Sequence, residues 1–178
     1  MKGQTAEASI TTSGSTYTVT SGDDLFNLLT NNKNYWSSQN VPPTDLTIKV
    51  ANTITLPGYD ASLYSGLTNV KVDFQQHQFY AGNYVASRVL IPRTSSAQLT
   101  VANVNNTSNA TTNQVTGVPN SAGTGTATAY LSTYYGMLFS SDFGLSGGTT
   151  SCAAQVTYDN VVYNMPNNLV YNQPLCTY

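Results

Sequence analysis

The segment Val156-Thr157-Tyr158-Asp159-Asn160-Val161-Val162 decides the predicted fold, because its pattern recurs along the chain. Two further copies are Thr47-Ile48-Lys49-Val50-Ala51-Asn52-Thr53-Ile54 and Leu99-Thr100-Val101-Ala102-Asn103-Val104. Each copy contains an apolar, a polar and an apolar residue, then any residue, an asparagine and a β-branched residue. Val70-Lys71-Val72 begins another copy that lacks the asparagine. Such alternation is typical of half-buried β-strands.

The recurring asparagine predicts how these strands are connected. Asn52, Asn103 and Asn160 lie where each strand would bend, and asparagine tolerates the left-handed backbone that a tight corner needs. Val70 follows Ile48 by 22 residues, which suggests a coil of about that length. We therefore expect a parallel β-solenoid whose coils stack. Alternation assigns Ile48, Val50, Leu99, Val101, Val156 and Tyr158 to the core face, with Lys49, Lys71, Thr100 and Thr157 on the other.

An antiparallel β-sandwich is the competing fold, since it also consists of many short strands separated by turns. A sandwich gives no reason for the asparagine to recur, so the solenoid is preferred. The asparagines are not separated by whole multiples of one coil, which predicts insertions between coils. Residues 105–128 are rich in Asn, Thr, Ser, Gly and Ala and carry no charge, so we expect an inserted surface loop there.

One helix is predicted near the start of the chain. Ser21 can cap it, Asp24 completes a capping box, and an apolar face begins at Leu25. It should end near Asn31 and cap the open end of the solenoid. The strands expected elsewhere are Thr16 to Thr20, Leu46 to Leu56, Leu67 to Phe74, Arg88 to Ile91, Gln98 to Val104 and Gln155 to Tyr163.

Composition limits the classes of function. The 178 residues suit a single domain. Only 8% are charged, against about a quarter in an ordinary soluble chain. The net charge of −2 and the lack of any Lys/Arg cluster exclude a typical nucleic-acid binder. No apolar stretch reaches the roughly 18 residues that span a bilayer, so direct membrane insertion is not expected.

Several of these segments resemble a known family. They are Ser21-Gly22-Asp23-Asp24-Leu25, Leu99-Thr100-Val101-Ala102-Asn103-Val104, Val156 to Asn164, and Asn168-Leu169-Val170-Tyr171-Asn172. Together they resemble the pectate-lyase-like adhesive domain of lactic-acid-bacterial surface adhesins, of the Lactobacillus epithelium adhesin type. The resemblance covers most of the chain and implies a right-handed β-solenoid on the cell wall. It also implies attachment to epithelium, mucus or matrix, and it transfers no ligand-binding residue.

The two cysteines, Cys152 and Cys176, are 24 residues apart. In a solenoid, residues one coil apart lie about 4.8 Å from each other, within the Cα separation that a disulfide requires. A disulfide would close the last coil and suits an extracellular protein. Two free, buried thiols are the alternative.

Catalytic residues are sparse in this sequence. A polysaccharide lyase on the same coil needs acids for Ca²⁺ and a base for the proton next to a carboxylate. Asp60 and Asp73, with Arg88 or Arg93 nearby, are the weak candidates, and His77 has the polar surroundings of a surface residue. No zinc-type cluster, phosphate-binding loop or nucleophile elbow occurs. We therefore expect no enzyme, no metal and no cofactor.

Two groups of residues are candidates for ligand binding. Exposed aromatic rings beside neutral polar groups favour glycans and proteins, and the candidates are Trp36, Tyr130, Tyr134 and Tyr135. The second group is a basic patch of Lys49, Lys71, Arg88 and Arg93, in which the two lysines are expected side by side one coil apart. Core packing of Trp36, and pairing of the basic residues with Asp45 or Asp73, are the structural alternatives.

The expected function is that of a monomeric, non-catalytic module at the bacterial cell surface, with its anchor outside this segment. Its partners would be host-surface glycans, mucin or matrix proteins. The rivals are a glycan-degrading enzyme on the same scaffold and a passive spacer that only projects another domain.

Overall fold

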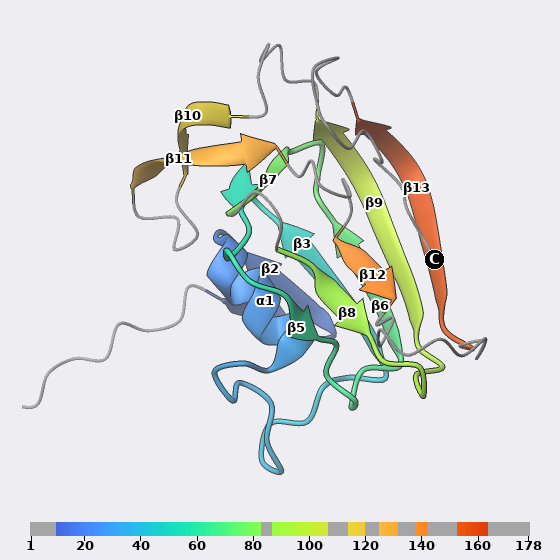
Figure 1. Cartoon of the computed structure of the whole chain (residues 1–178). Coiled ribbons are helices and arrows are strands. Elements are labelled where there is room, and N and C mark those ends of the chain that lie inside the picture. Colours follow the sequence, from blue (N-terminus) through green and yellow to red (C-terminus); the bar gives the residue numbers. More distant parts are fainter. Residues whose placement is uncertain are drawn as a thin grey trace, which may run out of the picture.

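The computed structural model describes residues 10–82, 87–106, 114–119, 125–131, 138–141 and 153–163. Within these ranges the chain is mostly β with one short helix, which confirms the predicted all-β class. The largest sheet has six strands in the spatial order β1 (Thr11–Ser13), β2 (Thr16–Val19), β3 (Asp45–Val50), β6 (Asn69–Asp73), β9 (Gln98–Asn106) and β13 (Gln155–Tyr163). Figure 1 shows its strands succeeding one another from blue to red across the molecule.

Two smaller sheets complete the architecture. The four-stranded sheet has the order β10 (Gln114–Pro119), β11 (Thr126–Leu131), β7 (Phe79–Ala81) and β4 (Ile54–Thr55). The three-stranded sheet has the order β12 (Phe139–Ser141), β8 (Val89–Ile91) and β5 (Ala61–Ser62).

Most strand pairs are parallel. In the six-stranded sheet, β2, β3, β6, β9 and β13 pair in parallel, and so do β4 with β7 and β5 with β8 and β12. The antiparallel pairs are β1 with β2, β10 with β11, and β11 with β7. This pairing is the opposite of what the competing antiparallel sandwich predicts.

The core lies on the inward face of the six-stranded sheet. Ile48, Val50, Leu99 and Val101 are buried, as alternation predicts, and Lys49 and Lys71 are exposed on the outward face. The same positions in β13, Val156 and Tyr158, are only half-buried. The largest fully buried rings are Phe26, Phe74, Phe79 and Phe139.

The register corrects the predicted coil length. Asp45 lies opposite Asn69, and the Asn69 Nδ2 donates to Asp45 Oδ1 across 24 residues of chain. The expected spacing of 22 residues is therefore wrong by two. A shift of two keeps every side chain on its face but changes its neighbours. Lys49 consequently lies opposite Asp73, and Lys71 opposite Thr47, so the lysines are not side by side as predicted.

The predicted asparagine corner exists in two of its three positions. Asn103 (φ 56°) and Asn160 (φ 54°) both adopt the left-handed backbone, and Asn160 Nδ2 donates to Asn103 Oδ1 at 2.9 Å. Asn103 Nδ2 donates in turn to Asp73 Oδ1 at 2.9 Å. Asn52 is exposed and does not have a positive φ, so the prediction is wrong for this residue. We call the three bonded side chains, Asp73, Asn103 and Asn160, the amide ladder.

The helix α1 (Gly22–Thr30) forms where the sequence predicts it. Ser21 Oγ accepts from the Asp24 N–H at 3.1 Å, and Asn31 ends the helix in the left-handed conformation (φ 55°). The start of α1 presses against β4, since a Cβ added to Gly22 would lie 1.8 Å from the Thr55 carbonyl oxygen. In Figure 1 the helix lies beside β2, at the N-terminal end of the succession of strands.

The stretch 105–128 is not a loop throughout. Its described parts include β10 and the start of β11, which pair with each other in an antiparallel ladder. β11 continues this ladder onto β7. Alternation of Thr, Ala and Val was present here, but the low charge and the many small residues favoured a loop prediction.

Candidate functional site

A pocket of about 160 Å³ lies between two successive turns that lead into the six-stranded sheet. The first turn joins β5 to β6, and the second joins β8 to β9. The lining residues are Leu63, Tyr64, Ser65, Leu67 and Thr68 from the first turn and Pro92, Thr94, Ser95, Ser96 and Ala97 from the second. We call this the turn pocket.

Backbone hydrogen bonds hold the two turns one above the other. The Leu63 N–H donates to Leu90 O at 2.8 Å, and the Gln98 N–H donates to Thr68 O at 2.8 Å. These bonds extend the parallel pairing of β5 with β8 and of β6 with β9 beyond the strands. The apolar residues Leu63, Leu67 and Ala97 are buried and anchor the turns to the core. The turn pocket is therefore part of the framework.

The polar groups of the turn pocket are hydroxyls. Two of them are used internally: Thr68 Oγ1 donates to Thr44 O at 2.9 Å, and Ser95 Oγ accepts from the Ala97 N–H at 3.1 Å. Four others have no hydrogen-bond partner among the described residues, namely the side-chain hydroxyls of Tyr64, Ser65, Thr94 and Ser96. No charged side chain is among the lining residues. This arrangement suits a neutral ligand rich in hydrogen-bonding groups.

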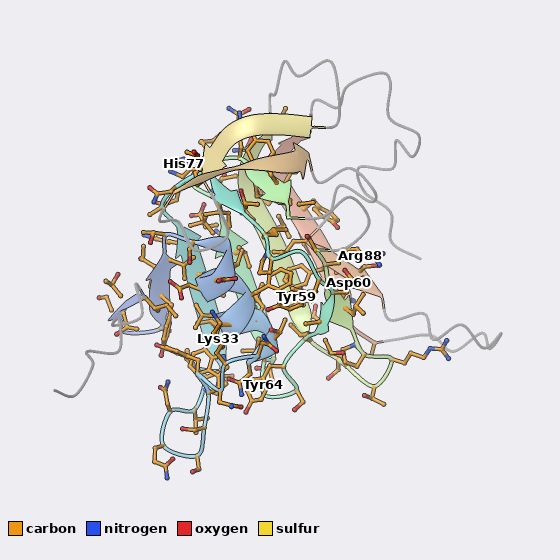
Figure 2. All side chains as sticks on the ribbon, turned by 60° about the vertical axis from the view of Figure 1, so that its left-hand side comes forward. Lys33, Tyr59, Asp60, Tyr64, His77 and Arg88 are labelled. Carbon is orange, nitrogen blue, oxygen red and sulfur yellow. The ribbon has the colours of Figure 1, made fainter. Side chains whose placement is uncertain are left out.

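A second polar cluster surrounds Asp60. Arg88 Nη2 donates to Asp60 Oδ2 at 2.6 Å and Nε to Oδ1 at 3.3 Å, so the ion pair is bidentate (Figure 2). The backbone N–H groups of Ser87 and Arg88 donate to the same Oδ1, at 3.0 and 2.9 Å. Burial alone would raise the pKa of Asp60, but the hydrogen bonds from Arg88 and Ser87 outweigh it and lower the pKa.

Acid is expected to weaken this cluster. The lowered pKa means that Asp60 stabilises the fold above the unfolded value of about 3.9, and that this stabilisation disappears as the pH falls through the folded pKa. At neutral pH, Asp60→Asn should lower the free energy of unfolding by about 1.5–3 kcal/mol. Urea denaturation of both proteins at neutral pH and near pH 2 would measure this. A difference that does not shrink at low pH would contradict the assignment.

The basic residues predicted as one patch lie in two places. Lys49 and Lys71 are on the outward face of the six-stranded sheet, whereas Arg88 precedes β8 and Arg93 follows it. Arg88 is engaged by Asp60, and Arg93 also has an interaction within the chain. Lys49 and Lys71 form no ion pair with the described residues. The structure therefore does not bring the four together.

Trp36 is buried, not an exposed platform. It is 2% exposed, and its Nε1 donates to Leu28 O at 2.7 Å. Its ring packs edge-on against Tyr17 and Tyr35, with centroids 5.3 and 4.8 Å apart. Tyr130 lies in β11, paired with Ala81. The remaining residues predicted from the sequence, Tyr134, Tyr135, Cys152 and Cys176, lie outside the described residues.

The acids considered for a lyase do not converge. Asp60 precedes β5 in the three-stranded sheet, whereas Asp73 ends β6 in the six-stranded sheet. Asp73 Oδ1 accepts from Asn103 and from the Gln75 N–H at 2.9 Å. His77 is half-exposed in the turn that follows β6. Among the described residues, no three His, Cys, Asp or Glu side chains are grouped closely enough to hold a metal ion.

Sequence reasoning missed the turn pocket. Leu63 to Thr68 and Pro92 to Ala97 contain no motif, and each is rich in small polar residues, as many turns are. The available signal was their shared position, since each ends where a core strand begins. Aligning the strands by the 24-residue coil would have placed the two turns next to each other.

Comparison with known proteins finds no matching family model, no matching curated protein and no matching solved structure. In the part of the chain that the structure describes, no helix combines the length and apolarity needed to cross a bilayer.

Proposed function

We propose that this chain is a non-catalytic adhesive module that binds glycans of host mucus, epithelium or matrix from the bacterial cell surface. The observation that carries the proposal is the turn pocket, in which four unpaired hydroxyls and no charge face the ligand space. Neutral hydrogen-bonding groups beside an aromatic ring suit carbohydrate. The resemblance to lactic-acid-bacterial adhesive domains supports the same function.

The proposed scaffold is a right-handed parallel β-solenoid. Three successive layers support it: β3, β4 and β5 are followed by β6, β7 and β8, and each strand pairs in parallel with its counterpart in the next layer. β9 and β12 continue two of the three sheets in parallel, while β10 and β11 interrupt the third with an antiparallel hairpin. Parallel strands joined by a crossover strongly favour the right-handed connection.

The non-catalytic part of the proposal rests on the state of the acids. Asp60 is held by Arg88 and two backbone N–H groups, and Asp73 by Asn103 and one. A carboxylate in such a network is a weak base and a structural group. The two acids are also in different sheets, so they do not form a pair around one substrate bond.

Binding of the purified chain to immobilised mucin tests the function. We expect saturable binding that is lost after enzymatic deglycosylation of the mucin and is little changed by added salt, because the turn pocket is uncharged. A passive spacer predicts no saturable binding. A lyase predicts unsaturated products from pectin or uronic-acid polymers, and either result would overturn the proposal.

The basic residues offer a control for the same assay. Replacing Lys49 and Lys71 together with alanine should leave mucin binding within about twofold, since the two exposed lysines lie on the outward sheet face and do not line the turn pocket. Loss of binding, together with strong salt dependence in the unmodified chain, would assign the ligand site to the lysines instead.

A further inference from the structure

The turn pocket has the size of a site for one small ring. Pockets for drug-sized ligands measure about 300–1,000 Å³, and the turn pocket has about 160 Å³. An oligosaccharide can therefore place one sugar unit inside it, while its neighbours remain outside. This limits recognition to a single residue of a chain or to a chain end.

The aromatic wall of the turn pocket is held in place from two sides. The Tyr64 N–H donates to Leu29 O at the end of α1, at 2.8 Å, and its carbonyl accepts from the Leu67 N–H at 3.1 Å. The Tyr64 ring lies against the bare backbone of Gly66, where an added Cβ would be 2.6 Å from Tyr64 Cε1. Gly66 thus provides the space that the ring occupies. Figure 2 shows Tyr64 well below Asp60 and Arg88 in that view, so the ring is separate from the ion pair.

The hydrogen-bonding groups around this ring discriminate by charge. The hydroxyls of Ser65, Thr94 and Ser96 can each donate and accept, which matches the hydroxyls of a sugar. A carboxylate or sulfate would enter a space with no lining cation, at the cost of desolvating its charge. Arg93 is in the second turn but does not line the pocket.

We propose that the turn pocket binds one neutral pyranose ring, which stacks on Tyr64 and is hydrogen-bonded by Ser65, Thr94 and Ser96. This inference rests on the proposed glycan-binding function and narrows it to a site and a ligand class. Sialylated and sulfated sugars are not ligands of this pocket.

Titration of the ¹⁵N-labelled full chain with single sugars tests the site. The probes are the methyl glycosides of glucose, galactose and N-acetylglucosamine, with N-acetylneuraminic acid and glucuronic acid as the charged counterparts. At least one neutral glycoside should shift the backbone amides of residues 64–66 and 94–97. Shifts confined to other regions, or stronger binding of the charged sugars at these amides, would overturn the proposal.

Variants of the aromatic wall sharpen the test. Tyr64→Ala should weaken neutral-sugar binding by about tenfold or more, because stacking on the ring is lost. Gly66→Ala should weaken it as well, since the new methyl displaces the ring without removing it. Tyr64→Phe keeps the ring and should lose less. Tyr59→Ala is the matched control, because Tyr59 is 38% exposed but does not line the pocket, and it should bind like the unmodified chain.

Failure of this inference differs from failure of the proposed function. If the chain binds mucin but Tyr64→Ala and Gly66→Ala bind it equally well, the turn pocket is not the site and the adhesive function stands. If the chain binds neither mucin nor any neutral glycoside, both are overturned. Circular dichroism of each variant shows whether it is folded, and Tyr64→Phe supplies the comparison if Tyr64→Ala is not.

Discussion

Gly22→Ala is expected to lower the free energy of unfolding by about 3 kcal/mol or more, because it places a methyl group inside a backbone contact. The new Cβ would lie 1.8 Å from the Thr55 carbonyl oxygen and 2.6 Å from its carbonyl carbon. Neither atom can move without shifting β4 away from β7. Urea denaturation followed by circular dichroism measures the change.

This result would have the opposite sign from helix propensity. Gly22 is the first residue of α1, and alanine is a better helix former than glycine. A variant as stable as the unmodified chain would therefore contradict the close contact between α1 and β4. Gly14→Ala is the control, because no atom lies within 4 Å of its added Cβ and its cost is limited to the left-handed backbone (φ 59°), about 1 kcal/mol.

Trp36→Ala should lower the free energy of unfolding by about 3–5 kcal/mol, since it leaves a cavity where a large buried ring was. The loss includes the hydrogen bond from Nε1 to Leu28 O and the edge contacts with Tyr17 and Tyr35. The measurement requires circular dichroism, because Trp36 is the chain's single tryptophan and its replacement removes that fluorescence.

The function of Trp36 is tested by a milder change. Trp36→Phe keeps an aromatic ring in the core and should cost less stability than alanine, while mucin binding of the folded protein stays unchanged. Loss of binding by a folded Trp36→Phe variant would contradict a purely structural role and restore the ring as a ligand platform.

The sequence predicted which face of each strand is buried, because that depends only on alternation. It did not predict the register, because sliding a strand by two residues preserves the alternation. Lys71 illustrates the limit: its exposure was predicted, but its neighbour, Thr47, was not. The neighbours depend on how long the connecting turns are, and the residues of those turns follow no periodic pattern.

Local signals performed well where the chain is its own partner. Ser21 and Asn31 bound α1 through contacts within a few residues, so the sequence contained the whole interaction. The turn pocket could not be predicted in the same way, since Tyr64 and Ser96 meet only after two layers have stacked. Trp36 shows a further limit, because burial beneath a helix and exposure on a surface require the same aromatic residue.

The amide ladder has a polarity that one carboxylate fixes. Asp73 can only accept, so Asn103 must turn its Nδ2 toward it, and this orientation leaves the Asn103 carbonyl for the Nδ2 of Asn160. Each side chain thus donates toward the N-terminal layer, and the outermost oxygen, Oδ1 of Asn160, receives no hydrogen bond from the described residues. A further layer stacked here would have to present a donor at that position. Aspartate can begin such a series but cannot extend it.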